Sequence, residues 1–264
     1  MAPGYAIFKD KDEIALLKKS SRISASTLEM IESYLKPGIS TNELDRICHE
    51  YITSHNGIPA PLGYKGFPKS ICTSINRVAC HGIPDEKILK DGDLLNIDVS
   101  LSLEGIFSDT CRMYFIGTPN IKAKRLAQCA QEALYRAIQK VKPGHSAREV
   151  GKAIEKCVNE YGYSIVKDFC GHGVGRHLHQ EPQILHYDDP FSDRYIFEPG
   201  MALTIEPIIN AGKPDVKILQ DGWTVVTKDQ SLSAQYEHTL IVTEDGCDVL
   251  TLRSDESVEK IFNI

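Results

Sequence analysis

An internal repeat constrains the fold of this 264-residue chain more than any other feature of the sequence. The segment KPGIS at 36–40 is followed by Glu43, and 106 residues later KPGHS at 142–146 is followed by Glu149. In both copies the proline and glycine end one helix, and a Ser-x-x-Glu capping box predicts the start of the next. Two matching helical units therefore indicate a duplicated fold.

The strand regions repeat in the same order as the helical units. Gly92 precedes a short apolar strand that ends in Asp98, and Gly200 precedes one that ends in Glu206. Two further pairs match in the same sense: Asp109-Thr110 with Glu237-His238-Thr239, and His81-Gly82 with His172-Gly173. Each match alone is weak, but their common order supports the duplication.

Apolar residues at helical spacing predict two helices in each copy. The first helix is expected to begin near Asp10 and to carry Ile14, Leu17, Leu28, Ile31 and Leu35. The second is expected to carry Leu44, Ile47, Cys48, Tyr51 and Ile52 and to stop at Asn56-Gly57. The matching apolar residues of the second copy are Leu126, Ala130, Leu134 and Ile138, then Val150, Ile154, Cys157 and Val158.

These patterns predict an α+β fold made of two halves, roughly residues 10–118 and 119–253, within a single domain spanning 1–264. Each half would contain two outer helices and an antiparallel sheet, and the halves would be related by a pseudo-twofold axis. A hydrophobic fraction of 42% is typical of a globular chain of this length. Equivalent acids and histidines would then converge on one central cleft.

Charge and composition exclude several classes of protein. The formal charge is −6, without the basic footprint of a nucleic-acid-binding protein. No apolar run is long enough for a membrane helix, and the first twenty residues lack the apolar core of a secretory signal. The eight cysteines form no CxxC pair, so we interpret them as thiols of a cytoplasmic protein.

A predicted hairpin brings two aspartates together. Polar residues alternate with apolar ones from Leu95 to Leu103, and Glu104-Gly105 is a plausible two-residue turn. With Leu103 opposite Ile106, Asp98 and Asp109 are diagonal neighbours on one face, roughly 7–8 Å apart at the backbone. They could meet over a shared ion, or they could be ordinary solvent-facing positions of the strand.

Three further residues favour the ion. Glu206 and Glu237 lie in apolar strand segments without a basic neighbour, and a buried carboxylate needs a partner. His172 stands between glycines, which would let the backbone bring its imidazole close to a ligand. Four carboxylates and one imidazole suit two divalent ions, about 3.5–4 Å apart, of Mn²⁺, Fe²⁺, Co²⁺ or Zn²⁺. Their identity stays open.

Other motifs are weaker. Gly171-x-Gly173-x-Gly175 lacks the following amphipathic helix of a dinucleotide-binding loop, and HExxH, Walker A and GxSxG patterns are missing. Cys80 beside His81 is interpreted as a buried structural thiol.

Asp98, Asp109, His172, Glu206 and Glu237, in this order and spacing, resemble the five metal ligands of the methionine aminopeptidases. Long segments share the resemblance: GYKGFPKSICTSIN (63–76), HGIP (81–84), NIDVS (96–100), GHGVGRHLHQEP (171–182), TIEP (204–207), DGWTV (221–225) and SLSAQYEHT (231–239). It implies the duplicated pita-bread fold around a central metal cleft. The short spacing between His179 and Glu206 and the start of the chain on the first helix resemble the type I, bacterial form.

The resemblance also implies roles. Counterparts of Asp109 and Glu237 bridge two metal ions, Asp98 chelates one of them, and His172 and Glu206 complete the other. A hydroxide bridging the metals would attack the first peptide carbonyl, with Glu206 as the proton shuttle. His179 would hydrogen-bond the scissile carbonyl and its oxyanion, and His81 the substrate amide on the opposite side. Without the motif context, His81 and His179 would be interpreted as ordinary core histidines.

The side-chain pocket implied by the resemblance is apolar and fits an unbranched thioether. Its candidate residues are Tyr64, Phe67, Cys72, Leu178 and Trp223. Asn76, Val78 and Ser233 match a monovalent-cation site of bacterial relatives. Two positions depart from the family pattern, namely Pro61, where some relatives have a pocket cysteine, and His177, an extra imidazole beside His179. Either could alter the pocket rim, and the extra imidazole could also bind metal.

The expected function is removal of the initiator methionine from nascent polypeptides whose second residue is small. A monomer that meets its substrates at the ribosome is expected. Two alternatives stay open: a prolidase or X-Pro aminopeptidase, which shares fold and ligands but usually has a further N-terminal domain, and a pita-bread binding protein that has lost its metals.

Overall fold

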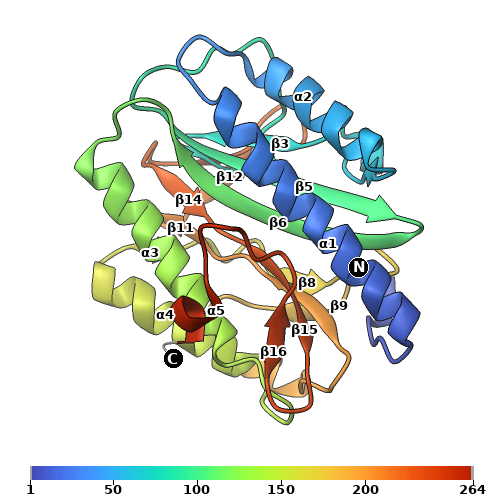
Figure 1. Cartoon of the computed structure of the whole chain (residues 1–264). Coiled ribbons are helices and arrows are strands. Elements are labelled where there is room, and N and C mark those ends of the chain that lie inside the picture. The colour runs from blue at the N-terminus through green and yellow to red at the C-terminus, as the bar shows by residue number, and fades with distance from the viewer. Residues whose placement is uncertain (1, 263–264) are drawn as a thin grey trace.

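The structure is a computed structural model that describes residues 2–262. Helices gather in two groups, one on each side of the strands (Figure 1). The helices are α1 (Lys11–Ile31), α2 (Thr41–Ser54), α3 (Ile121–Ile138), α4 (Arg148–Tyr161) and α5 (Val258–Phe262). Short 3₁₀ turns lie at η1 (Glu32–Tyr34), η2 (Tyr64–Gly66) and η3 (Pro190–Arg194).

The strands form several mostly antiparallel sheets. Before residue 119 they are β1 (Ala2–Tyr5), β2 (Ile58–Pro59), β3 (Cys72–Ile75), β4 (Val78–Cys80), β5 (Leu94–Leu103) and β6 (Ile106–Phe115). In the second half they are β7 (Ser164–Ile165), β8 (Gly171–Gly173), β9 (Gln180–Ile184), β10 (Ala202–Ile205), β11 (Ile208–Asn210), β12 (Val216–Ile218), β13 (Val225–Thr227), β14 (Ser233–Gln235), β15 (His238–Val242) and β16 (Cys247–Val249).

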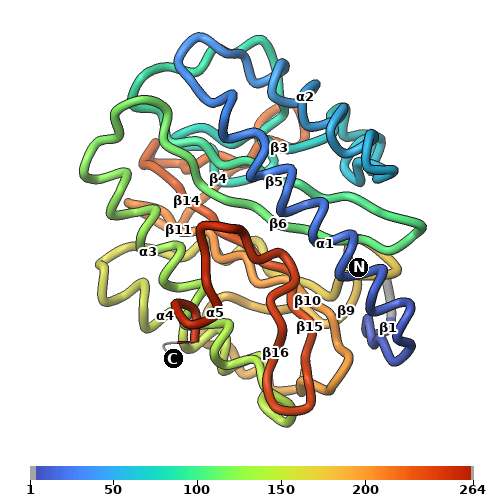
Figure 2. The backbone as a smooth tube through the Cα atoms, in the orientation of Figure 1, coloured from blue at the N-terminus to red at the C-terminus, as the bar shows by residue number. Residues whose placement is uncertain are grey.

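Four sheets organise these strands. The largest has the order β1-β9-β8-β10-β15-β16, and β5 pairs with β2 and β3 as well as with β6. The two smaller sheets have the orders β14-β11-β7 and β12-β13-β4. In the latter, β4 of the first half pairs with β13 of the second half. The backbone view shows the long β5–β6 hairpin crossing the middle of the molecule (Figure 2).

Two hydrophobic cores match the two groups of helices. In one, α1 and α2 pack on the apolar face of β5, whose Leu95, Ile97, Val99 and Leu101 are fully buried. In the other, α3 and α4 pack against β10, β11, β14 and β15. Because side chains alternate along a strand, Asn96, Asp98 and Ser100 point to the opposite face of β5, away from the helices.

The two copies of the KPG segment make the same backbone contacts. The amide of Gly38 donates to the carbonyl of Leu89, and the amide of Gly144 donates to that of Phe197, both at 2.9 Å. Isolated bridges join Ser40 to Ile88 in one copy and Ser146 to Ile196 in the other. The repeat read from the sequence is therefore present in the structure, while the exact limits of the halves stay a prediction.

The helix starts of the first copy are as predicted. The Asp10 side chain accepts from the amides of Asp12 and Glu13, and the Ser40 side chain accepts from the amide of Glu43. The predicted end of α1 is wrong, since α1 ends at Ile31, before Leu35. The predicted stop of α2 at Asn56-Gly57 is confirmed, since α2 ends at Ser54 and Asn56 has a φ of 61°. The 3₁₀ turn η1 takes the place of the last predicted turn of α1.

The predicted capping box of the second copy is wrong. Helix α4 begins after Ala147, which caps it with no side-chain hydrogen bond. The Ser146 hydroxyl donates instead to Asp193 Oδ1 at 3.0 Å, a partner 47 residues away. The cap is lost because Ala147, already in helical conformation, takes the N-cap position, and the Ser146 side chain makes a tertiary contact.

The apolar run 203–209 is divided between two strands. β10 ends at Ile205 and β11 begins at Ile208, and Glu206-Pro207 lies between them. A proline has no amide to donate to a neighbouring strand, so the ladder stops there. β10 pairs with β8 and β15, whereas β11 pairs with β7 and β14. The chain therefore changes sheets at Glu206.

Two smaller expectations concern thiols and membranes. All eight cysteines are free thiols, as expected. Within residues 2–262, every helix is too short or too polar to cross a bilayer.

Candidate metal centre

The β5–β6 hairpin has the register predicted from its turn. Leu103 lies opposite Ile106, Ser100 opposite Asp109, and Asp98 opposite Cys111. Both aspartates therefore lie on the face of the hairpin that is turned away from α1 and α2. The Ser100 hydroxyl donates to Asp109 Oδ1 at 2.8 Å, which fixes one carboxylate oxygen and leaves the other free.

The second half supplies two glutamates from the ends of paired strands. In the antiparallel pair β10–β15, Ile205 lies opposite His238. Glu206 follows the first of these residues and Glu237 precedes the second, so both leave the same end of the pair. The amide of Glu237 donates to the carbonyl of Cys111 at 3.1 Å, which joins this end to β6.

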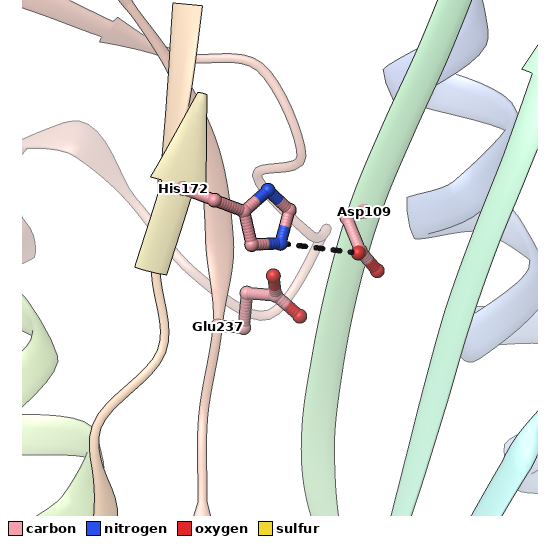
Figure 3. A group of neighbouring side chains, drawn as sticks. All are labelled: Asp109, His172 and Glu237. Carbon is pink, nitrogen blue, oxygen red and sulfur yellow. Dashed lines mark ion pairs between the residues drawn. The ribbon is translucent and has the colours of Figure 1, made fainter. Parts of the chain in front are cut away.

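His172 is the central residue of β8, whose Gly173 lies opposite Leu203 of β10. Figure 3 shows its imidazole pointing toward Asp109 of β6 and toward Glu237. His172 Nε2 lies 3.4 Å from Glu206 Oε1 and 3.8 Å from Asp109 Oδ2. One ligand atom each from Asp109, His172 and Glu237 all lie within 4.8 Å of one another.

The glycines beside His172 serve strand packing. A Cβ on Gly173 would lie 2.1 Å from the carbonyl oxygen of Glu181, and one on Gly171 would lie 2.4 Å from that of Thr204. Neither contact could be relieved by a side-chain movement, because both meet backbone atoms. Glycine therefore lets β8 fit between β9 and β10, which holds His172 at the cluster.

Burial of the four carboxylates changes their acidity. It raises the pKa of Asp109 to about 6, and burial together with neighbouring acids raises the pKa of Asp98 and Glu237 well above the usual range. The pKa of Glu206 is also raised well above its usual range, by burial and by Asp109. Burial lowers the pKa of His172 to about 4, so its imidazole is neutral at pH 7.

The donor set fits divalent metal ions. Asp98 Oδ1 and Glu237 Oε1 are buried without a hydrogen-bond partner. Among the described residues, no Lys or Arg forms a salt bridge with Asp98, Asp109, Glu206 or Glu237. Bound cations would satisfy these oxygens and remove the repulsion, and carboxylates with a neutral imidazole suit Mn²⁺, Fe²⁺, Co²⁺ or Zn²⁺.

Three residues that support the cluster were missed in the sequence. The Thr204 hydroxyl donates to Glu206 Oε1 at 2.9 Å and accepts from the amide of His172 at 3.1 Å. Gln235 Nε2 donates to Glu206 Oε2 at 3.2 Å. The buried His186 accepts, through Nε2, from the amides of both Gly171 and Glu206 at 3.2 Å. Thr204 could have been found, since residues two apart on a strand share a face.

The carboxylates line a cavity of about 340 Å³. All the predicted site residues line it: Tyr64, Phe67, Cys72, His81, Asp98, Asp109, His172, Leu178, His179, Glu206, Trp223 and Glu237. Pro61 also lines it, whereas His177 is exposed and lies outside it. Lys65, Cys80, Ser100, Asp168, Phe169, Cys170, Ile208 and Gln235 complete the wall.

The two candidate catalytic histidines lie on different parts of this wall. His179 Nδ1 is 3.1 Å from the Tyr64 hydroxyl, and its ring centroid is 4.4 Å from that of His172. His81 packs edge-to-face on Phe169 and on Trp223, at 5.4 Å and 6.1 Å. Burial lowers the pKa of His81 to about 4 and that of His179 to about 3, so both are neutral hydrogen-bonding groups at pH 7.

Asn76 and Ser233, two of the three residues matched to a monovalent-cation site, are adjacent. The amide of Ser233 donates to the carbonyl of Asn76 at 2.8 Å. The third, Val78, lies in β4 opposite Val226 of β13. The Asn76 side chain is held by Asp93 and by the amide of Leu94.

Comparison with known proteins agrees with this geometry. The model of metallopeptidase family M24 matches residues 15–244. Methionine aminopeptidase of Escherichia coli K12 is 51% identical over 257 residues, 97% of each chain. The crystal structure of methionine aminopeptidase from Rickettsia prowazekii superposes with a TM-score of 0.91 at 47% identity, covering 94% of this chain and all of that one.

A prolidase shares the fold at a greater distance. The enzyme from Pyrococcus furiosus is 24% identical with a TM-score of 0.75, and this chain covers 66% of its length. That likeness concerns the fold alone. The α+β architecture and the pita-bread fold expected from the sequence are confirmed. With its cluster of metal-binding side chains, this chain belongs to metallopeptidase family M24 and, within it, to the methionine aminopeptidases.

Proposed function

We propose that this enzyme hydrolyses the first peptide bond of polypeptides that begin with methionine and have a small second residue. The observation that carries the proposal is a cluster of buried and half-buried carboxylates without basic partners in the wall of a partly apolar cavity. The high identity to methionine aminopeptidases supports the same substrate.

Two divalent ions of Mn, Fe, Co or Zn are proposed as the cofactor, with a monovalent cation near Asn76, Val78 and Ser233. Asp109 and Glu237 would hold both divalent ions, Asp98 would hold one, and His172 and Glu206 would hold the other. Four carboxylate charges match two divalent cations. When bound, the ions would supply a Lewis acid for the carbonyl and a hydroxide nucleophile at neutral pH.

Glu206 is suited to move a proton in this reaction. Burial and the neighbouring Asp109 raise the pKa of its carboxyl in the metal-free protein, and a positioned carboxyl group can accept and release a proton during a reaction. The Thr204 hydroxyl and the Gln235 amide each hold one oxygen of its carboxylate. They keep the group oriented while it passes a proton to the leaving amine.

His179 and His81 are suited to bind the peptide bond on either side. Because both imidazoles are neutral, each offers one N–H donor and one acceptor. His179, oriented by the Tyr64 hydroxyl, would donate to the scissile carbonyl and to the negative charge that develops on it. His81, packed between Phe169 and Trp223, would contact the substrate amide.

The apolar wall suits an unbranched side chain. Phe67 and Trp223 meet edge-to-face at 5.1 Å, and the buried Cys72 and Leu178 line the same cavity. A thioether gains from contact with aromatic rings as well as from burial. Since the substrate is a chain still being synthesised, we propose a cytoplasmic monomer that meets the ribosome transiently.

The test is release of free methionine from Met-Ala-Ser by protein stripped with a chelator and resupplied with each divalent metal. Release should need metal and fall to background in Asp98→Ala. Asp248→Ala, which removes an exposed carboxylate paired with Lys18, is the matched control and should leave release unchanged. No release with any metal would refute the proposal. Cleavage of an Ala-Pro peptide instead would indicate a prolidase.

A further inference from the structure

Arg253 is among the largest fully buried side chains of the described residues, and the proposed reaction does not use it. It lies in the segment between β16 and α5, 143 residues after its partner Thr110. A buried guanidinium is costly unless its donors are satisfied. Its partners therefore show what the residue is for.

One branch of its contacts reaches Glu237. Arg253 Nη1 donates to the Thr110 hydroxyl at 3.2 Å, and that hydroxyl donates to the carbonyl oxygen of Glu237 at 2.8 Å. Because the arginine can only donate, it forces the hydroxyl proton toward Glu237. Because Thr110 directly follows Asp109 in β6, this contact ties the strand segment that carries Asp109 to the backbone of Glu237.

The other branch reaches the neighbouring strand. Arg253 Nη2 lies 3.3 Å from Nε2 of His238, whose Nδ1 is 2.9 Å from the Thr251 hydroxyl. That hydroxyl accepts from the amide of Thr239 at 3.0 Å. The Thr239 hydroxyl in turn accepts from the amide of Asp109 and donates to its carbonyl, at 3.1 Å and 2.7 Å.

The charge of the guanidinium is compensated within the same segment. Arg253 Nη2 donates to Glu256 Oε1 at 2.8 Å, and the Arg253 amide donates to Glu256 Oε2 at 3.1 Å. The Tyr135 hydroxyl of α3 also donates to Glu256, at 2.7 Å. The pair therefore adds no net charge beside the cluster.

We propose that Arg253 is a positioning residue that fixes the backbones of Asp109 and Glu237, and with them the spacing of the two carboxylates that would bridge the metals. This inference rests on the proposed metal site. Arg253 itself touches no carboxylate of the cluster. Lysine would not replace it, because a single ammonium cannot reproduce the planar fork that reaches Thr110, His238 and Glu256 together.

The test separates positioning from folding by removing both charges at once. Arg253→Met alone would leave the buried Glu256 without its guanidinium partner, so the decisive variant is R253M/E256Q, which retains an acceptor for Tyr135. Arg253→Lys is the conservative variant. Arg112→Met is the matched control, because Arg112 also joins β6 to this segment, through Asp255, without contacting Thr110 or His238.

Each protein, freed of metal, is titrated with Co²⁺ while visible absorption and heat of binding are recorded, and its melting temperature is measured without metal. R253M/E256Q and Arg253→Lys should bind Co²⁺ about 10–100-fold more weakly, with altered absorption bands, as for other residues that orient metal ligands. Arg112→Met should match the original protein in affinity and spectrum. A folded R253M/E256Q with unchanged affinity and spectrum would overturn the inference.

The outcome also distinguishes this inference from the proposed function. If the original protein binds no Co²⁺, the proposed metal site fails and the role of Arg253 fails with it. If the original protein binds Co²⁺ and every variant binds it equally well, only the role of Arg253 fails.

Discussion

Asp109→Asn should make the metal-free protein more stable at neutral pH, although it removes a residue of the metal cluster. Burial raises the pKa of this carboxyl from 3.8 to about 6. At ~1.4 kcal/mol per pKa unit, ionisation of Asp109 therefore destabilises the folded protein by about 3 kcal/mol relative to the unfolded chain. The amide keeps an oxygen that accepts from Ser100, and its NH₂ can donate to His172 Nε2, which lies 3.8 Å from the carboxylate.

The sign of the pH dependence follows from proton linkage. The folded protein holds the Asp109 proton more tightly than the unfolded chain, so this group stabilises the fold fully below its unfolded pKa of 3.8. That contribution is lost as pH rises from 3.8 through about 6. Asn does not titrate, so its advantage over Asp should be absent at low pH and reach the full ~3 kcal/mol above about pH 6.

Thermal unfolding of metal-free protein at about pH 7.5 measures the effect. A gain of ~3 kcal/mol corresponds to about 6–12 °C in melting temperature for a chain of roughly this size. Adding Mn²⁺ at about 100 times its Kd should stabilise the original protein by ~2.7 kcal/mol and the variant by much less. Asp168→Asn, an exposed carboxylate on the same cavity, is the control and should change neither value.

The reasoning is refuted if metal-free Asp109→Asn melts at or below the original protein at this pH. It is equally refuted if the difference between the two is the same at pH 4 and at pH 7.5. Either result would mean that the buried carboxylate is not a source of instability in the absence of metal.

Two further predictions concern residues beside the cluster. Gly173→Ala would place a Cβ 2.1 Å from the Glu181 carbonyl oxygen. It should lower the free energy of unfolding by on the order of 2–4 kcal/mol and weaken metal binding. Gly246→Ala is the control and should do neither, because its Cβ would lie 4.0 Å from the nearest atom. Equal melting temperatures for the two variants would contradict the close-packing argument. His179→Gln should lower kcat about 10²–10³-fold without moving the pH profile between pH 5 and 7, since burial already lowers the His179 pKa to about 3. A profile that shifts in this range would show that the imidazole is protonated during the reaction.

The parts of the fold predicted correctly are those that depend on local chemistry. The two-residue turn after Leu103 set the register of β5 and β6, and that register placed Asp98 and Asp109 on one face. The cap at Asp10 was visible because its partners, Asp12 and Glu13, are only two and three residues away. Local hydrogen bonds of this kind do not depend on how the rest of the chain folds.

The parts predicted wrongly or missed depend on partners far along the chain. Ser146 has the sequence of a helix cap, but Ala147 takes the cap position and the Ser146 hydroxyl donates to Asp193, a contact that no local pattern reveals. The switch between sheets at Glu206-Pro207 was not predicted, because an apolar run does not show which strands it will pair with. His186 was missed because it acts on backbone amides of Gly171 and Glu206, and such a role leaves no side-chain pattern in the sequence.

The long separations within the cluster have a consequence for how the enzyme is made. The backbone of Asp109 is held by Thr239, 130 residues later, and Thr110 by Arg253, 143 residues later. When the β5–β6 hairpin has been synthesised, the residues of the second half that hold Asp109 and complete the metal cluster do not yet exist. Asp98 and Asp109 therefore stand without these partners. The site is completed only after Arg253 has left the ribosome, so a growing copy cannot process other chains before that point of its own synthesis.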